Sequence, residues 1–152
     1  MNQGGIEALV EAIRSAGWYE GNISKVETLP PRHASYGDLP SGLAPEVVEY
    51  LEHAGINRLY SHQALTLEKA MSGASVIMST ATASGKTLGF TLPVLQEMAQ
   101  DPDACALFLY PLKALTNDQL DVFRFVEESS GVQIDAAVYD GDTPRIRRPR
   151  IR

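Results

Sequence analysis

Apolar residues near the start of the chain recur at the spacing of one helix face. The i, i+3, i+4, i+7 pattern is followed by Ile6, Leu9, Val10 and Ile13. This spacing predicts a short amphipathic helix that packs through its apolar face and ends around Gly17.

Residues 23–45 have no helical period because prolines and glycines interrupt them repeatedly. These residues are Pro30, Pro31, Gly37, Pro40, Gly42 and Pro45. The stretch is predicted to be an extended, turn-rich connector. A helix is predicted over residues 45–53, since Pro45 suits a first helical turn and Gly55 suits a helix end. A second helix is expected to follow, with Ser61 as its cap.

After Gly73 the apolar pattern changes to short runs of strand length. Residues 75–79, 104–110 and 132–139 are predicted to be strands. Because helical segments are predicted between these runs, the order of elements indicates an α/β fold with a mostly parallel sheet flanked by helices.

Two helices are predicted between the strands. The first begins near Gly85 and reaches Met98, and Pro93 should kink or interrupt it. The second covers residues 112–129. Its expected core contacts are Leu115, Leu120, Phe123 and Val126.

Composition favours one globular unit, with 152 residues, 44% hydrophobic and 21% charged. The longest apolar run, residues 105–112, is shorter than the roughly 18 residues that a membrane helix needs. No leader sequence is readable at the N-terminus, so a cytoplasmic location is expected. Cys105 is the only cysteine, which excludes a disulfide within the chain, and its apolar neighbours predict a small core residue.

The charge of the chain is uneven. The net charge is −6, yet five of the 13 basic residues are arginines within residues 145–152, a stretch without acids. The remaining 144 residues therefore carry 8 basic against 19 acidic groups, or −11. The arginines are Arg145, Arg147, Arg148, Arg150 and Arg152. They are interpreted either as a solvated helix face or as a phosphate-binding end.

A phosphate-binding loop is predicted between the first strand and the helix that follows it. Loop amides and the positive end of a helix converge where a strand turns sharply into a helix, and this arrangement favours phosphate. Lys86 would neutralise the β and γ oxygens, and Thr87 would place its hydroxyl on Mg²⁺. The loop residues are Thr80, Ala81, Thr82, Ala83, Ser84, Gly85, Lys86 and Thr87.

The loop departs from the strict form G-x-x-x-x-G-K-[ST], because Thr80 and Ala83 stand where many phosphate loops have glycine. A chance Gly-Lys-Thr at a helix start is the alternative. The apolar strand predicted before the loop and the helix predicted after it favour the phosphate loop.

With these motifs in place, the sequence resembles the superfamily-2 (DEAD/DEAH-box) helicases, whose loop reads A-x-T-G-S-G-K-T. The strings YGDLP, LYSHQ, TATASGKT, LYPLKALTNDQL and YDGDTP are most similar to the repair helicases of the MrfA and Hrq type. The resemblance implies an ATP-dependent DNA helicase acting in DNA repair, with ATP and Mg²⁺ as cofactors. It implies a partial RecA-like domain over residues 55–152, preceded by a lead-in of residues 1–54.

The resemblance also assigns roles ahead of the loop. Gln63 resembles the adenine-reading glutamine of the family, and a carboxamide can accept a hydrogen bond from the adenine amino group while donating one to N7. Lys86 is the expected catalytic residue. Tyr60 is expected either to stack on the base or to pack as a hydrophobic staple at the helix start.

Residues 111–115, PLKAL, resemble motif Ia, which contacts the backbone of one nucleic-acid strand. Lys113 is the expected phosphate partner, and Leu112 departs from the threonine of many relatives. Residues 140–143 follow the third predicted strand, where open α/β sheets place ligands, although a plain Asp-Gly turn is the alternative. The predicted contacts to single-stranded DNA are Pro111, Lys113, Ala114 and Gly141.

No D-E-x-[HD] string occurs in the 152 residues. The chain is therefore expected to be an N-terminal piece that needs the remainder of its protein, and to bind ATP without hydrolysing it. Two other functions stay open. One is a non-catalytic remnant that holds nucleotide or nucleic acid, and the other is a different phosphate-loop enzyme such as a small-molecule kinase.

Overall fold

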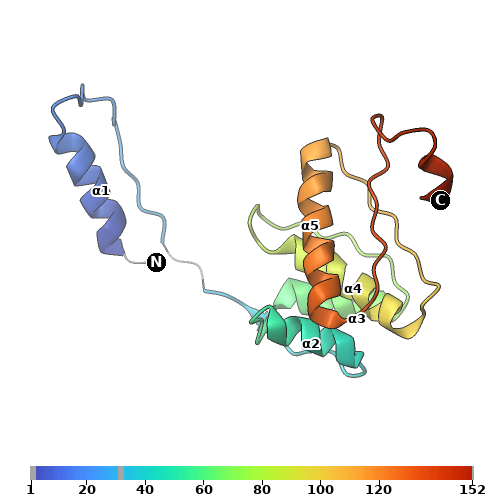
Figure 1. Ribbon diagram of the computed structural model, residues 1–152. Helices are drawn as coiled ribbons and strands as arrows, with labels where there is room; N and C mark the ends of the chain where they lie inside the picture. Colours follow the sequence, from blue (N-terminus) through green and yellow to red (C-terminus); the bar gives the residue numbers. More distant parts are fainter. Residues whose placement is uncertain (1–2, 31–32, 152) are drawn as a thin grey trace. The chain divides into compact units, whose positions relative to one another are not determined.

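The structure, a computed structural model, describes residues 3–30 and 33–151 (Figure 1). It divides into two compact units, Met1–His33 and Ala34–Arg152. Pro31 of the predicted connector and Arg152 of the basic end lie outside the described residues.

The first unit contains one helix, α1 (Gln3–Ser15), in its described part, so the predicted amphipathic helix is confirmed. Its apolar face is poorly covered, because Ile6 is 64% and Leu9 59% exposed. The expectation that this face packs is therefore wrong for these two residues. A turn after the helix is closed by a hydrogen bond from the Ile23 amide to the Tyr19 hydroxyl, at 2.9 Å.

The second unit is mainly helical. Its elements are β1 (Tyr36–Gly37), α2 (Pro45–His53), β2 (Leu59–Tyr60), α3 (Ser61–Met71), α4 (Lys86–Gln100), α5 (Lys113–Ser130) and the short 3₁₀ helix η1 (Arg148–Arg150). β1 and β2 pair antiparallel, with Tyr36 opposite Tyr60. The described parts of the predicted connector contain no helix before α2, as expected.

The start and end of α2 agree with the prediction. Pro45 lies in the first turn, and Gly55 just after the helix takes φ +67°, which glycine adopts without strain. The predicted cap of α3 is wrong, because Ser61 is the first helical residue and Tyr60 holds the cap position. The Tyr60 amide donates to Gln63 Oε1 at 2.8 Å, so the glutamine stabilises this helix start.

Helix α4 runs without interruption through Pro93 to Gln100, so the expected break at the proline is wrong. Proline removes only one backbone donor from the helix. Leu92 and Leu95, on either side of Pro93, are 0% and 1% exposed. Their burial holds both halves of the helix on the core and compensates for the lost hydrogen bond.

The core lies where α2, α3, α4 and α5 pack on one another. Its fully buried apolar side chains are Val47, Leu59, Leu67, Leu92, Leu95 and Val126. Gln96 of α4 reaches across this core, since its Oε1 accepts from the Ala44 amide at 2.8 Å and its Nε2 donates to the Gly42 carbonyl at 3.3 Å. The end of the connector is thereby fixed to α4.

Predictions for individual core residues have mixed outcomes. Phe123 and Val126 are buried, as expected, and Leu120 is half-buried. Leu115 and Cys105 are exposed, so their predicted core positions are wrong.

The predicted parallel sheet is not found among the described residues, where the only sheet is the antiparallel pair β1–β2. Residues 75–79, 104–110 and 132–139 contain no strand, contrary to the prediction. Ile77 is 96% exposed, and Leu107 and Leu109 are each 85% exposed. A strand requires a neighbour that pairs with its N–H and C=O groups, and these segments have none in the described part of the chain.

Among the described residues, none of the helices combines the length and the apolar character needed to cross a membrane.

Candidate nucleotide and nucleic-acid site

Residues 80–85 form a tight loop that leads directly into α4. Gly85 takes φ +76° and α4 begins at Lys86, as predicted from the sequence. Ala83 takes φ +57°, and it is the only non-glycine residue with positive φ in the described chain. The loop thus adopts two left-handed residues within three positions, which brings its backbone into a tight curve.

The Lys86 side chain folds back into this loop. Its Nζ donates to the Thr80 carbonyl at 2.8 Å and to the Ala81 carbonyl at 2.5 Å. The hydroxyls of Thr80 and Ser84 lie 2.7 Å apart and within 3.5 Å of the same ammonium group. A phosphate bound at this loop would compete with carbonyl oxygens for Lys86.

The loop amides suit an anion. Apart from the tight turn at residues 82–83, the N–H groups of residues 81–85 find no protein acceptor within the described residues. They lie beside the first turn of α4, where the helix dipole favours negative charge. Polar amides with no acceptor, a helix N-terminus and a lysine are together the donor set that a phosphate group needs.

Helix α3 is bonded to the phosphate loop through two consecutive side chains. His62 Nε2 lies 3.0 Å from the Ser84 carbonyl oxygen, and Gln63 Nε2 donates to the Gly85 carbonyl at 2.8 Å. A Cβ atom at Gly85 would lie only 2.6 Å from Gln63 Nε2, so glycine is needed for this approach. Gln63 is 4% exposed, and both ends of its carboxamide bind protein groups.

An aromatic stack adjoins the start of α3. The Tyr36 and Tyr60 rings are 5.5 Å apart and stacked, and the Tyr60 and His62 rings are 5.8 Å apart and stacked. The Arg58 guanidinium lies 4.2 Å from the Tyr36 ring centre. Sequence reasoning identified Tyr60 but missed Tyr36, Arg58 and His62. The available signals were the strings YGDLP, which begins with Tyr36, and LYSHQ, which places His62 directly before Gln63.

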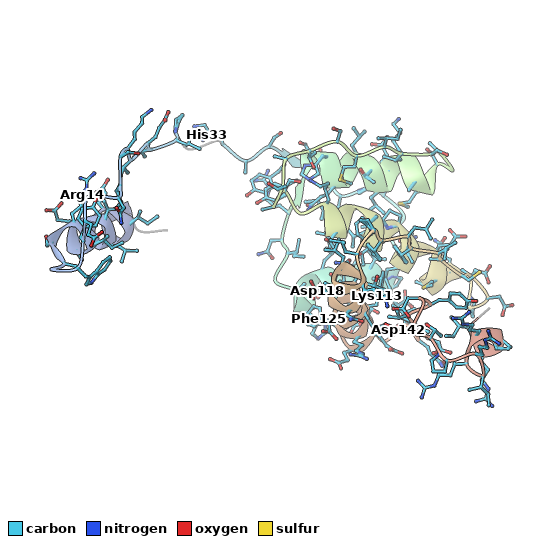
Figure 2. All side chains as sticks on the ribbon, turned by 90° about the horizontal axis from the view of Figure 1, so that it is seen from above. Arg14, His33, Lys113, Asp118, Phe125 and Asp142 are labelled. Atoms are coloured by element: carbon cyan, nitrogen blue, oxygen red, sulfur yellow. The ribbon has the colours of Figure 1, made fainter. Side chains whose placement is uncertain are left out.

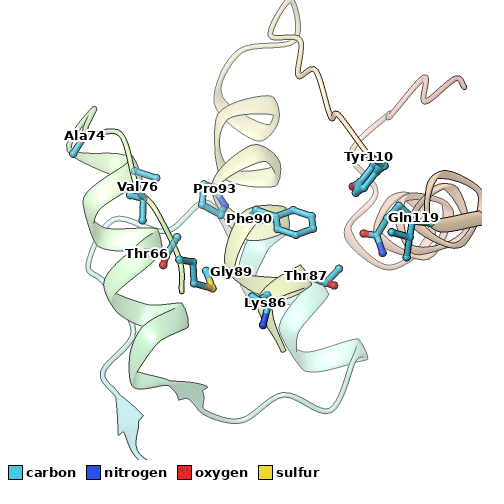
Figure 3. Close-up of a pocket in the computed structure, with 13 residues that line it drawn as sticks. Thr66, Ala74, Val76, Lys86, Thr87, Gly89, Phe90, Pro93, Tyr110 and Gln119 are labelled. Atoms are coloured by element: carbon cyan, nitrogen blue, oxygen red, sulfur yellow. The ribbon is translucent and has the colours of Figure 1, made fainter. Parts of the chain in front are cut away.

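A cleft of about 580 Å³ opens beside the first turn of α4. Figure 3 shows Val76 on one wall, Tyr110 and Gln119 on the opposite wall, and Lys86 and Thr87 between them. The Tyr110 hydroxyl and Gln119 Oε1 are buried without a hydrogen-bond partner in the described structure. Burial also raises the pKa of Tyr110.

The predicted nucleic-acid residues come together at the start of α5. Lys113 is the first residue of that helix, and its Nζ bonds to the carboxylate of Asp142 and lies 3.6 Å from Asp140 Oδ2 (Figure 2). Gly141 sits in the turn between these two aspartates. Pro111, Ala114 and Gly141 are all exposed. The structure therefore places PLKAL beside the loop of residues 140–143, which the sequence had not predicted.

The charges of this cluster perturb one another. The hydrogen bond with Asp142 raises the pKa of Lys113, although desolvation opposes it, and the charge of Asp140 adds to the increase. Burial works to raise the pKa of Asp140. Hydrogen bonds from the Asp142 amide and from Thr143, with the charge of Lys113, outweigh burial and hold that pKa below its ordinary value. Both side chains are therefore ionised near neutral pH.

The basic end partly folds onto the same loop. Arg148 Nε donates to the Thr143 carbonyl at 3.0 Å, and its guanidinium lies 5.6 Å from the Tyr139 ring centre. Arg145, Arg147 and Arg150 are exposed. Exposure of these three residues fits both interpretations offered by the sequence, whereas Arg148 is held in place.

A sharp loop, followed at once by a helix whose first residue is lysine, is typical of phosphate-loop proteins. The family of DEAD/DEAH box helicases matches residues 60–152, and the chain belongs to this family. This membership sets aside the small-molecule kinase considered from the sequence.

Two relatives show how much of such a protein the chain represents. It is 37% identical over 131 residues to the ATP-dependent helicase YprA of Bacillus subtilis, covering 86% of this chain and 18% of YprA. It is 35% identical over 149 residues to the ATP-dependent helicase HRQ1 of Saccharomyces cerevisiae, covering 97% of this chain and 14% of HRQ1. The chain thus spans less than a fifth of the length of either relative.

The fold is similar to that of a solved helicase. The crystal structure of the DUF1998 helicase MrfA bound to DNA and AMPPNP matches with a TM-score of 0.76 and 37% identity. The match covers 81% of this chain and 17% of the MrfA chain. This likeness indicates a RecA-like fold, and it agrees with the MrfA and Hrq resemblance found in the sequence motifs.

Proposed function

We propose that this chain is the ATP-binding front part of an ATP-dependent DNA helicase that acts in DNA repair. The observation that carries the proposal is the loop of residues 80–85, whose free amides and Lys86 lie at the N-terminus of α4. YprA and HRQ1 are ATP-dependent helicases, and this supports the same activity for the protein to which this chain belongs.

In this proposal the phosphates of ATP lie against the amides of residues 81–85, and Lys86 exchanges loop carbonyls for phosphate oxygens. Thr87, in the first turn of α4, supplies one hydroxyl to Mg²⁺. No group of three or more His, Cys, Asp or Glu side chains that could hold a metal is found among the described residues. Nucleotide oxygens and water are ligands that Mg²⁺ commonly keeps at phosphate sites, and they would accompany the Thr87 hydroxyl.

Gln63 remains the proposed adenine reader, with Tyr60 as the candidate for stacking. The structure sets a condition on this role, because the Gln63 carboxamide already bonds to Tyr60 and Gly85. At least one of these bonds has to be exchanged for a bond to the base. Tyr60 is 40% exposed and its ring already stacks on those of Tyr36 and His62, so a base that stacks on Tyr60 would join or replace these neighbours.

We further propose that Pro111, Lys113, Ala114 and Gly141 contact the backbone of a single DNA strand. The bound DNA in the MrfA crystal structure supports a nucleic-acid partner, and the choice of DNA and of a single strand is our proposal.

The three apolar segments that lack strands here would form a parallel sheet in the complete lobe. The domain boundary predicted at residue 55 stays a prediction. The packing of α2 against α4 and α5 favours counting α2 with the lobe. The cytoplasmic location also stays a prediction.

The nucleotide part is tested by titrating a fluorescent ATP analogue into residues 1–152 with Mg²⁺ present. Lys86→Ala should abolish binding, because it removes the cation that meets the β and γ phosphates. Lys69→Ala, which removes an exposed lysine from α3, is the matched control and should bind like the parent chain. Equal binding by both variants would refute the phosphate-loop assignment.

Base recognition is tested in the same assay by competition with ATP and with GTP. An adenine-reading Gln63 requires ATP to compete better than GTP, and Gln63→Ala should remove the difference. Hydrolysis is measured in parallel, since the 152 residues lack a D-E-x-[HD] string and should bind ATP without turnover. Phosphate release that persists in the parent chain and stops in Lys86→Ala would contradict this last expectation.

A further inference from the structure

The loop of residues 140–143 supplies two carboxylates to the lysine that the proposed function assigns to a DNA phosphate. Lys113 Nζ bonds to Asp142 and lies 3.6 Å from Asp140 Oδ2. A carboxylate and a phosphate offer this ammonium the same kind of acceptor, a charged oxygen. The lysine that a DNA phosphate would bind is thus already paired with a carboxylate of the protein itself.

The two carboxylates are held very differently. Asp140 is built into the turn, since its Oδ1 accepts from the amides of Asp142 at 2.9 Å and Thr143 at 3.0 Å, and its side chain is only 26% exposed. The Asp142 side chain is 84% exposed, and Lys113 is its bonding partner in the described structure. Asp142 can therefore release the lysine without disturbing the turn.

We propose that Asp142 is an internal substitute for a nucleic-acid phosphate, which a bound strand must displace from Lys113, while Asp140 is a positioning residue that keeps the ammonium directed at the strand. This inference rests on the proposed role of Lys113. It adds that the bond to Asp142 and the bond to DNA exclude each other, so that Asp142 lowers the affinity for DNA.

The pairing has a second consequence for selectivity. A single free anion gains little by replacing Asp142, because the exchange substitutes one ion pair for another at an exposed site. A strand presents several linked phosphates, so it can displace Asp142 while other phosphates remain bound. Arg148 of η1 donates to the Thr143 carbonyl at 3.0 Å, so it lies against the same loop and offers a second cation.

The test measures binding of a short fluorescein-labelled oligothymidine to the full chain by fluorescence anisotropy at low salt. Asp142→Asn keeps the side-chain size and removes its charge. Asp118→Asn is the matched control, since it makes the same change of charge at an exposed position on α5 that forms no ion pair among the described residues (Figure 2). Thermal unfolding of each variant checks that the fold is intact.

Asp142→Asn should tighten binding by about two- to fivefold relative to Asp118→Asn, the range expected for releasing one exposed ion pair. The gain should shrink as salt screens the charges. It should disappear when Lys113→Ala is added, because the competition runs through that lysine. Asp140→Asn should instead weaken binding, because the Lys113 ammonium would lose the carboxylate that keeps it directed at the strand.

Each outcome decides between the two proposals. If the parent chain binds the strand and Lys113→Ala weakens binding, yet Asp142→Asn gains no more than Asp118→Asn, the substitute role of Asp142 is refuted and the proposed DNA contact stands. If the gain persists with Lys113→Ala, it comes from general charge, and the inference is again refuted. If no variant binds the strand, the proposed DNA contact and the inference both fail.

Discussion

Ala83 is the position in the phosphate loop where a single substitution tests the structure most directly. It takes φ +57°, in the left-handed region that residues with a Cβ atom disfavour. It is also the position where the superfamily loop pattern A-x-T-G-S-G-K-T has glycine. Ala83→Gly should therefore relieve backbone strain without removing a buried contact, because the side chain is exposed.

The expected magnitude follows from two opposing terms. Left-handed backbone costs a non-glycine residue about 1–2 kcal/mol, and glycine avoids this penalty. Glycine also loses more conformational entropy on folding, which costs about 0.4–1 kcal/mol. The net expectation is that Ala83→Gly stabilises the folded chain by up to about 1.5 kcal/mol.

Ala81→Gly provides the matched control. Ala81 is exposed in the same loop, does not take positive φ and contacts Lys86 only through its backbone carbonyl. It should be destabilised by about 0.4–1 kcal/mol, the entropic term alone. Because that term is common to both substitutions, the difference between the two variants measures the strain at Ala83, about 1–2 kcal/mol.

Urea denaturation followed by circular dichroism gives the free energy of unfolding for the parent chain and both variants. A shift in the transition midpoint at constant slope reports a change in stability. If both glycine variants lose the same stability, Ala83 is not strained, and the left-handed loop described here is wrong.

Two further predictions concern neighbouring sites. Gly85→Ala should destabilise the chain by at least about 1–2 kcal/mol, since it adds left-handed strain and its Cβ would lie 2.6 Å from Gln63 Nε2. Gly141→Ala is the control and should not destabilise the chain, because the space around Gly141 is open. Equal urea midpoints for the two variants would contradict this expectation. Asp140 has a lowered pKa, so its ionised form stabilises the fold above the ordinary value of 3.8, and this contribution is lost as the pH falls through the lowered value. A carboxyl NMR titration should show the Asp140 pKa rising in Thr143→Ala, which removes the hydroxyl hydrogen bond and keeps those from the Asp142 and Thr143 amides, and an unchanged pKa would exclude the hydroxyl as one of its causes.

The helices could be predicted from the sequence because their signals are local. Pro45 and Gly55 mark the two ends of α2, and the spacing of Phe123 and Val126 identifies the buried face of α5. Strands could not be predicted in the same way. An apolar run such as residues 104–110 shows that a strand would fit, but pairing depends on a neighbour elsewhere in the chain, and none of the described residues provides it.

For the site, the sequence identified the chemistry of single residues but not their mutual contacts. The helix start at Lys86 follows from the loop motif itself. The bond from Gln63 to the Gly85 carbonyl, across 22 positions, depends on how α3 packs against α4. The ion pair of Lys113 with Asp142 spans 29 positions and has no periodic signal. Pairings of this kind follow from tertiary packing, which local patterns do not encode.

The two lysines assigned to phosphates are both bonded to oxygen atoms of their own loops, and the difference between those oxygens bears on function. Lys86 bonds to neutral carbonyls of Thr80 and Ala81, whereas Lys113 bonds to a charged carboxylate. Both lysines are charged donors, so the difference lies in the acceptor, and the full negative charge of a carboxylate attracts an ammonium more strongly than a carbonyl dipole does. A phosphate should therefore displace the carbonyls from Lys86 more readily than it displaces Asp142 from Lys113, so that the loop at α4 is the more easily occupied of the two sites.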